Sequence, residues 1–177
     1  MKLWAIFIAS LLVSLPVAAN EDMLIPMHSH GTHTYYIHSV IHGAGEYSML
    51  VDTGSGYSVI NQDTLDRLMA QGQATYVSRL RGKMADGSER IVPLYQISAI
   101  TLGNTCVIRD IKAAVIPNSA RQIIGISTLM QAAPFSMAFD PPVLSLSQCE
   151  LALPNPQTVA AISVPDSHPA AAPAPAQ

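Results

Sequence analysis

The residue best placed to do chemistry is Asp52, which interrupts an apolar stretch over residues 48–60. Aspartate is disfavoured in strands, and a buried carboxylate is costly unless hydrogen bonds or a shared charge offset its desolvation. The following residues, Thr53, Gly54 and Ser55, supply two hydroxyls and a glycine that lets the backbone turn sharply. The pattern predicts a carboxylate held at a loop tip by its neighbours, although an ordinary hairpin turn uses the same residue types.

Amide hydrolysis by water needs one group that accepts a proton and another that donates one. Two carboxylates in contact provide both, because they do not ionise together and their pKa values separate as they share one proton. Asp52 is the only aspartate of this sequence that is followed by Thr-Gly, and the sequence has no internal repeat. A second carboxylate of this kind therefore has to come from a second copy of the chain.

Two further motifs follow Asp52-Thr53-Gly54 along the chain, one at residues 84–88 and one at residues 122–127. Their order and spacing resemble the retropepsin-like aspartic proteases over residues 31–146. The resemblance implies that Asp52 is catalytic. It assigns active-site support to Thr53, Gly54 and Ser55. It assigns the flap to Met84, Ala85, Asp86, Gly87 and Ser88. It assigns the second signature to Ile123, Ile124 and Gly125.

The resemblance also implies a homodimer in which the two Asp52 carboxylates meet at the two-fold axis, and an acidic pH optimum. Ser55 would then donate a hydrogen bond to the Asp52 carboxylate, and Thr53 would bond across the axis. Viral enzymes of the family carry an ion pair at the positions of Gly56 and Ile126. Since both charged partners are absent here, no buried charge is left unpaired, and substrate preference should differ from that of the viral enzymes. Exported bacterial relatives with a single motif are the closer comparison.

Short β-branched and aromatic segments separated by turns predict an all-β fold, a small barrel. The resemblance implies that this is a closed barrel of the acid-protease (retropepsin-like) type. Strands are expected at residues 34–40, 47–51, 75–83, 89–97, 97–102, 106–116, 121–125, 136–139 and 143–146. One or two short helices are expected, at residues 61–70, capped by Asn61, and at residues 127–131. The barrel is expected to be active as a symmetric dimer.

The two ends of the chain differ in composition from the middle. Residues 1–19 have Lys2, an apolar run and a Val-Ala-Ala site, which predicts a secretory signal peptide, with an uncleaved anchor as the alternative. We therefore expect an exported protein, periplasmic or secreted, without stable membrane insertion after cleavage. Residues 20–30 are expected to be a flexible arm, residues 31–148 the protease domain, and residues 149–177 a disordered tail rich in Pro and Ala.

Charge and histidine content restrict the partners. The net charge is −3 without a basic run, which argues against nucleic acid and leaves a peptide or protein substrate and a second copy as the expected partners. The aspartic mechanism needs no cofactor and no metal. His28, His30 and His33 could hold Zn or Cu, but no acidic or Cys ligand accompanies them, so a solvated arm is the preferred interpretation.

A second function class stays open, an inactive protease-like module that binds peptides or partners in the cell envelope. The Asp-Thr-Gly sequence favours catalysis, because a binding module has no evident need for a desolvated carboxylate.

Cys106 and Cys149 are the only cysteines of the chain. Export permits a disulfide, which could be intramolecular or intermolecular, or the thiols could stay free. We expect the intramolecular bridge.

Overall fold

A computed structural model describes residues 22–31, 33–84, 86–119 and 121–152 of the chain. The predicted signal peptide and all but the first few residues of the predicted tail lie outside these described residues. No helix within them is long and apolar enough to cross a membrane.

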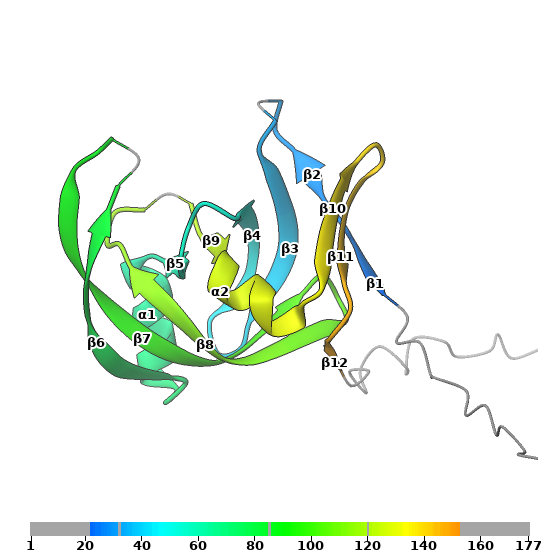
Figure 1. Cartoon of the computed structure of the whole chain (residues 1–177). Helices are drawn as coiled ribbons and strands as arrows, with labels where there is room; N and C mark the ends of the chain where they lie inside the picture. The colour runs from blue at the N-terminus through cyan, green and yellow to red at the C-terminus, as the bar shows by residue number, and fades with distance from the viewer. Residues whose placement is uncertain (1–21, 32, 85, 120, 153–177) are drawn as a thin grey trace, which may run out of the picture.

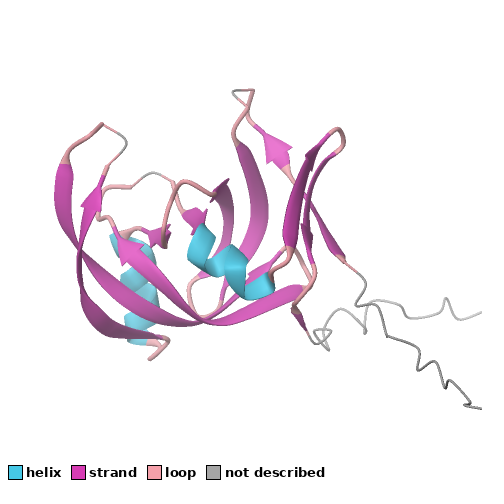
Figure 2. Ribbon diagram, viewed as in Figure 1, coloured by secondary structure: helices cyan, strands magenta, loops and turns pink. Residues whose placement is uncertain are grey.

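Six strands form a closed barrel, so the predicted all-β class is confirmed (Figures 1 and 2). The sheet order is β8-β5-β9-β4-β3-β7, and the barrel closes because β7 also pairs with β8. The barrel strands are β3 (Tyr35–Ile41), β4 (Gly45–Asp52), β5 (Ser58–Ile60), β7 (Glu89–Leu102), β8 (Cys106–Val115) and β9 (Ile123–Gly125). Large apolar side chains fill the interior, including Ile37, Met49, Ile100 and Ile124, each at most 1% exposed.

Three strands extend this sheet beyond the barrel, and three more form a separate sheet. β6 (Ala74–Lys83) pairs with β7, β2 (His28–Ser29) with β3, and β12 (Glu150–Leu151) with β8. The second sheet has the order β1-β11-β10, with β1 (Met23–Pro26), β10 (Phe135–Phe139) and β11 (Pro142–Leu146). One end strand of this small sheet comes from the start of the described chain and the other two strands come from its end.

The helices are short, as predicted. In α1 (Gln62–Ala70) the Asn61 side chain accepts the Thr64 N–H at 2.9 Å, which confirms the predicted cap. Leu65 and Leu68 are buried, whereas Met69 is 51% exposed. α2 (Ile126–Leu129) continues into a single 3₁₀ turn, η1 (Met130–Ala132).

Three boundaries differ from the sequence predictions. The two strands expected at residues 89–97 and 97–102 are one long strand, β7, because no turn residue separates them and the strand runs from an outer hairpin into the barrel. The prediction of a flexible arm at residues 20–30 is wrong for its described part, since β1 pairs with β11 and Ile25 is 2% exposed. The ordered domain also continues past residue 148, because Cys149 is disulfide-bonded and residues 150–151 form β12.

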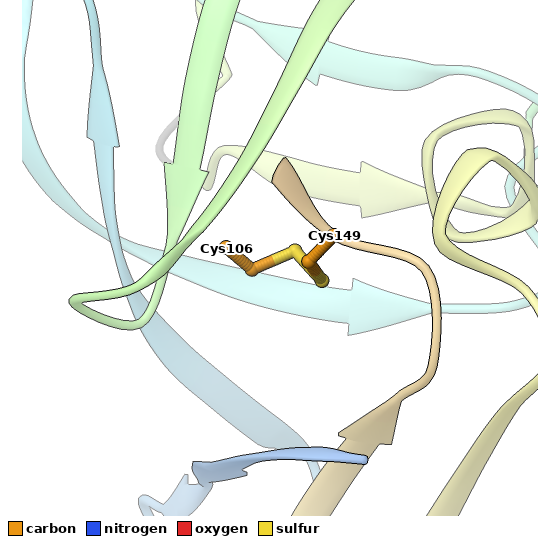
Figure 3. The surroundings of a disulfide bond; sticks show 2 residues. All are labelled: Cys106 and Cys149. Atoms are coloured by element: carbon orange, nitrogen blue, oxygen red, sulfur yellow. A yellow bond between two sulfur atoms is a disulfide. The ribbon is translucent and has the colours of Figure 1, made fainter. Parts of the chain in front are cut away.

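Cys106 and Cys149 are joined in a disulfide that links the first residue of β8 to the residue before β12 (Figure 3). Beside it, the Arg109 guanidinium donates two hydrogen bonds to the Glu150 carboxylate, at 2.7 and 2.9 Å. This contact raises the pKa of Arg109 and lowers the pKa of Glu150. Covalent and ionic contacts thus fasten the end of the described chain to the barrel.

Removing the disulfide should lower stability measurably. The bridge spans 43 positions in sequence, and closing a loop of this size in the unfolded chain typically stabilises a protein by about 2–4 kcal/mol. Double replacement Cys106→Ala/Cys149→Ala should lower the free energy of unfolding by this amount in a urea titration. Wild-type protein treated with a dithiol reductant is the control without a core cavity, and an unchanged urea midpoint in both samples would contradict the prediction.

Candidate active site

Asp52 is the last residue of β4, and its side chain is half-buried at the start of the loop to β5. Its Oδ1 accepts the Gly54 N–H at 2.9 Å, and the Ser55 N–H donates to the Asp52 carbonyl at 3.2 Å. A Cβ on Gly54 would lie 3.1 Å from the same carboxylate oxygen, so glycine leaves room for this contact. The carboxylate is therefore held at a loop tip by its neighbours, as the sequence pattern predicts.

The expected role of Ser55 is wrong in one respect. Its hydroxyl donates to the Tyr57 carbonyl at 2.7 Å rather than to the Asp52 carboxylate. A hydroxyl has a single proton, and the turn directs it toward the carbonyl two residues ahead. Ser55 thus stiffens the loop that carries Asp52 and does not bond to the carboxylate itself.

The second signature lies directly beside this loop. β9 runs parallel to β4 with Asp52 opposite Gly125, so the two motifs lie side by side in the sheet. The Ile126 N–H donates to the Ser55 carbonyl at 2.8 Å, and the Ser127 N–H donates to the Gly56 carbonyl at 3.3 Å. These two hydrogen bonds hold the Asp52 loop against the first residues of α2.

Two buried hydroxyls that sequence reasoning missed complete the junction. The Ser58 Oγ accepts the Gly125 N–H at 3.1 Å and lies 2.8 Å from the Thr128 Oγ1. Both side chains are at most 1% exposed. The sequence signal for this contact was a serine directly before the apolar pair Val59-Ile60, because a buried hydroxyl needs a hydrogen-bond partner.

Ser58→Ala should destabilise the junction. The substitution leaves the buried Gly125 N–H and the Thr128 hydroxyl without this partner, which costs about 1–3 kcal/mol. The measurement is the free energy of unfolding from urea titration, and Ser119→Ala, in an exterior loop, is the matched control. A Ser58→Ala protein as stable as the control would show that another group replaces the hydroxyl.

A cavity of about 680 Å³ opens beside Asp52. Its lining is mainly apolar, and the Tyr35 and Phe139 rings in it lie 4.9 Å apart between centroids. Phe139 is nevertheless 56% exposed. The lining residues are His33, Thr34, Tyr35, Leu50, Val51, Asp52, Thr53, Met137 and Phe139. A cavity of about 730 Å³ near both ends of the described chain contains none of the signature residues, so we do not assign the chemistry to it.

The predicted flap is the turn between β6 and β7, and it projects from the same end of the barrel as the Asp52 loop (Figure 1). The Met84 N–H donates to the Ser88 carbonyl at 2.8 Å, and Gly87 has the positive φ that the turn needs. The Ser88 hydroxyl and N–H both donate to the Asp86 carboxylate, at 2.6 and 2.9 Å, which holds the pKa of Asp86 below its ordinary value. Ala85 lies outside the described residues.

The three histidines considered as metal ligands are only partly brought together. The His28 and His30 rings lie 5.3 Å apart between centroids, and the His28 Nε2 lies 2.8 Å from the Ser48 Oγ. His33 instead lines the cavity beside Asp52. Across the described ranges, no three His, Cys, Asp or Glu side chains are grouped so that they could hold a metal ion.

Comparison with known proteins agrees with this geometry. The family model of the gag-polyprotein putative aspartyl proteases matches residues 37–131, which include Asp52, the flap and the second signature. The chain superposes on the crystal structure of a retropepsin-like aspartic protease from Rickettsia conorii with a TM-score of 0.52 and 16% identity, over 71% of this chain and 91% of that one. No curated protein matches the chain. With the Asp-Thr-Gly loop, the flap hairpin and the second signature assembled on this barrel, the chain belongs to the gag-polyprotein putative aspartyl protease family and has the retropepsin-like fold.

Proposed function

We propose that this chain is an aspartic endopeptidase whose active form is a symmetric homodimer. The observation that carries the proposal is the position of Asp52, a half-buried carboxylate held by the Gly54 N–H at the edge of an open cavity. Asp52 is the last residue of β4, and β4 ends on the flap side of the barrel (Figure 1). Family membership supports the general activity. The dimer follows from chemistry, because one chain supplies one Asp-Thr-Gly motif.

In the proposed mechanism the two Asp52 carboxylates share one proton and hold a water molecule between them, the scheme known for aspartic proteases in general. The ionised carboxylate takes a proton from the water as its oxygen attacks the scissile carbonyl carbon. The protonated carboxylate gives its proton to the carbonyl oxygen, which yields a tetrahedral diol. Collapse of the diol breaks the C–N bond: the leaving nitrogen takes up the proton held by the dyad, and a diol hydroxyl returns its proton to the other carboxylate, so the dyad again shares one proton.

Neighbouring residues have supporting roles in this proposal. Gly54 and Ser55 hold the loop, through the bonds to the Asp52 carboxylate and to the Tyr57 carbonyl. Thr53 is exposed beside Asp52, where it could reach the partner subunit across the two-fold axis. The flap, residues 84–88, would close over a bound peptide and exclude bulk water.

We further propose that the protein works outside the cytoplasm, in the periplasm or as a secreted protein. The composition of residues 1–19 supports export. The disulfide between Cys106 and Cys149 supports an oxidising compartment.

Subunit mixing tests the shared site most directly. Wild-type protein is dissociated and reassociated with increasing amounts of Asp52→Asn protein, and cleavage of a peptide library is followed at mildly acidic pH. If each site needs one carboxylate from each subunit, equal amounts leave about a quarter of the dimers with both aspartates, and activity per wild-type chain falls to about half. A wild-type activity that mixing leaves unchanged would contradict a shared site.

Sedimentation of the same samples separates the alternatives. A wild-type dimer that cleaves peptides establishes the proposal. A folded dimer that binds peptides from the library without cleaving any would instead identify the chain as a binding module.

A further inference from the structure

One face of the hairpin β6–β7 combines positive charge with exposed apolar side chains. The strand register places Tyr76 opposite Tyr95, Arg79 opposite Pro93, Arg81 opposite Ile91 and Lys83 opposite Glu89. Residues directly opposed in a sheet share a face, and side chains alternate between faces. The register shifts between Tyr76 and Ser78, so Tyr76 lies on the same face as Arg79 although three positions separate them. We call this the outer face of the hairpin, and it comprises Tyr76, Arg79, Arg81, Lys83, Glu89, Ile91, Pro93 and Tyr95.

The other face of the hairpin packs against the body of the protein. Val92 and Leu94 are buried there in a small cluster with Ala114, and Leu80 and Ile116 pack against it. The outer face is exposed to solvent at its distal end, from Arg79 to Lys83 and from Glu89 to Ile91. At its base Pro93 and Tyr95 are half-buried, and Tyr95 packs against the main core. It also lies apart from the cavity at Asp52, whose lining includes no residue of either hairpin strand.

Charge is distributed unevenly over the described residues. The hairpin holds four of their eight Lys and Arg side chains, at positions 79, 81, 83 and 90, but only two of their ten Asp and Glu side chains. The hairpin is thus net positive, and the remainder of the described chain is net negative. Arg81 pairs with Glu89 at 3.1 Å, whereas Arg79 and Lys83 make no ion pair with any described residue.

Apolar groups lie among these cations. Ile91 is 66% exposed and Tyr76 is 53% exposed. Cations on an edge strand such as β6 are a common protection against edge-to-edge aggregation. That protection explains Arg79 and Lys83, but it does not explain exposed Ile91 and Tyr76 on the same face.

We propose that the outer face of the hairpin is a peripheral docking surface for an anionic phospholipid bilayer. Arg79 and Lys83 would lie among lipid phosphates, while Ile91 and the Tyr76 ring would enter the boundary between headgroups and acyl chains. The net negative remainder of the protein would be repelled by the same surface, which orients the molecule with its hairpin toward the membrane. The proposal concerns where the protein sits and does not depend on its peptidase activity.

Vesicle co-sedimentation with the full chain tests the proposal. Vesicles of phosphatidylcholine alone are compared with vesicles of equal parts phosphatidylcholine and phosphatidylglycerol, and the ratio of the two partition coefficients is the readout. Residues 1–19, where retained, are common to all variants and carry one cation, Lys2, so they do not produce differences between variants. We expect the wild-type ratio to be well above one at low salt and to fall as salt screens the charges.

Matched variants locate the surface. Arg79→Ser/Lys83→Ser should lower partitioning onto the anionic vesicles about 30-fold, from the usual contribution of a Lys or Arg near such a surface. Lys112→Ser/Arg121→Ser removes the same charge from other exposed positions and should change it less than about threefold. Ile91→Ser should weaken binding at high salt as well, since its contribution is not electrostatic.

Two results would overturn the proposal. One is a wild-type ratio near one, and the other is an equal loss in the two double variants, which would indicate net charge alone. Binding to soluble polyglutamate without binding to anionic vesicles would assign the outer face to an acidic peptide instead.

Discussion

Asp52→Asn should abolish peptide cleavage while leaving the protein folded. In the wild-type protein the Gly54 N–H donates to the Asp52 Oδ1 at 2.9 Å. The asparagine amide is nearly the same size as the carboxylate, and its oxygen still accepts this hydrogen bond. It does not act as a general base, and such catalysis typically contributes about 10²–10⁴-fold to the rate. We expect kcat/KM for a library-derived peptide to fall by at least about 10³-fold, with the free energy of unfolding changed by less than about 1 kcal/mol.

Asp63→Asn is the matched control for this experiment. Asp63 is an exposed residue in the first turn of α1, and its replacement removes the same charge without touching the loop. It should retain wild-type kcat/KM. Residual cleavage in Asp52→Asn equal to that of Asp63→Asn would mean that the chemistry lies elsewhere or comes from another protein in the sample.

Gly125→Ala should prevent the protein from folding stably. A Cβ at this position would lie 2.3 Å from both the carbonyl carbon and the oxygen of Tyr57, and 2.8 Å from the Ser58 nitrogen. All three are backbone atoms, so no side-chain rotation relieves the overlap, and β5 and β9 would have to separate. We expect a loss of at least about 4 kcal/mol in the free energy of unfolding, seen as a low urea midpoint or insoluble protein.

Gly56→Ala provides the comparison. A Cβ on Gly56 would meet nothing within 4 Å, so this substitution should change the free energy of unfolding by less than about 1 kcal/mol. If Gly125→Ala were as stable as Gly56→Ala, the close approach of the two signature motifs would be wrong.

The sequence predicted those features that depend on short stretches of chain. The Asp52 loop, the turn at residues 84–88 and the helix capped by Asn61 are all specified by residues a few positions apart. Turn and cap chemistry is local, so residue types at fixed offsets indicate it directly. The strand pattern predicted a small barrel, and the resemblance specified its acid-protease type because it related these local motifs to one another.

The features that were missed depend on residues far apart in the sequence. The Ser58 and Thr128 hydroxyls meet across 70 positions, and Met23 pairs with Leu146 across an even longer stretch. A four-residue strand such as β1 has too few alternations to show a period, so the pairing of β1 with β11 was not foreseen. The hydroxyl of Ser55 was assigned the wrong acceptor because both candidate acceptors lie within two or three residues of it.

The small sheet β1-β11-β10 has a consequence for how the proposed peptidase could be controlled. In this sheet β1 comes from the start of the described chain, and β10 and β11 come from near its end. Met23 to Pro26 pair with Val143 to Leu146 of the same chain. The two ends of the described chain therefore pair with each other, and the fold of a subunit does not need a strand from a second subunit. In the proposed homodimer, dilution would then give intact, silent monomers, and concentrating them would restore cleavage without a refolding step. The local concentration of the protein would in this way control its activity.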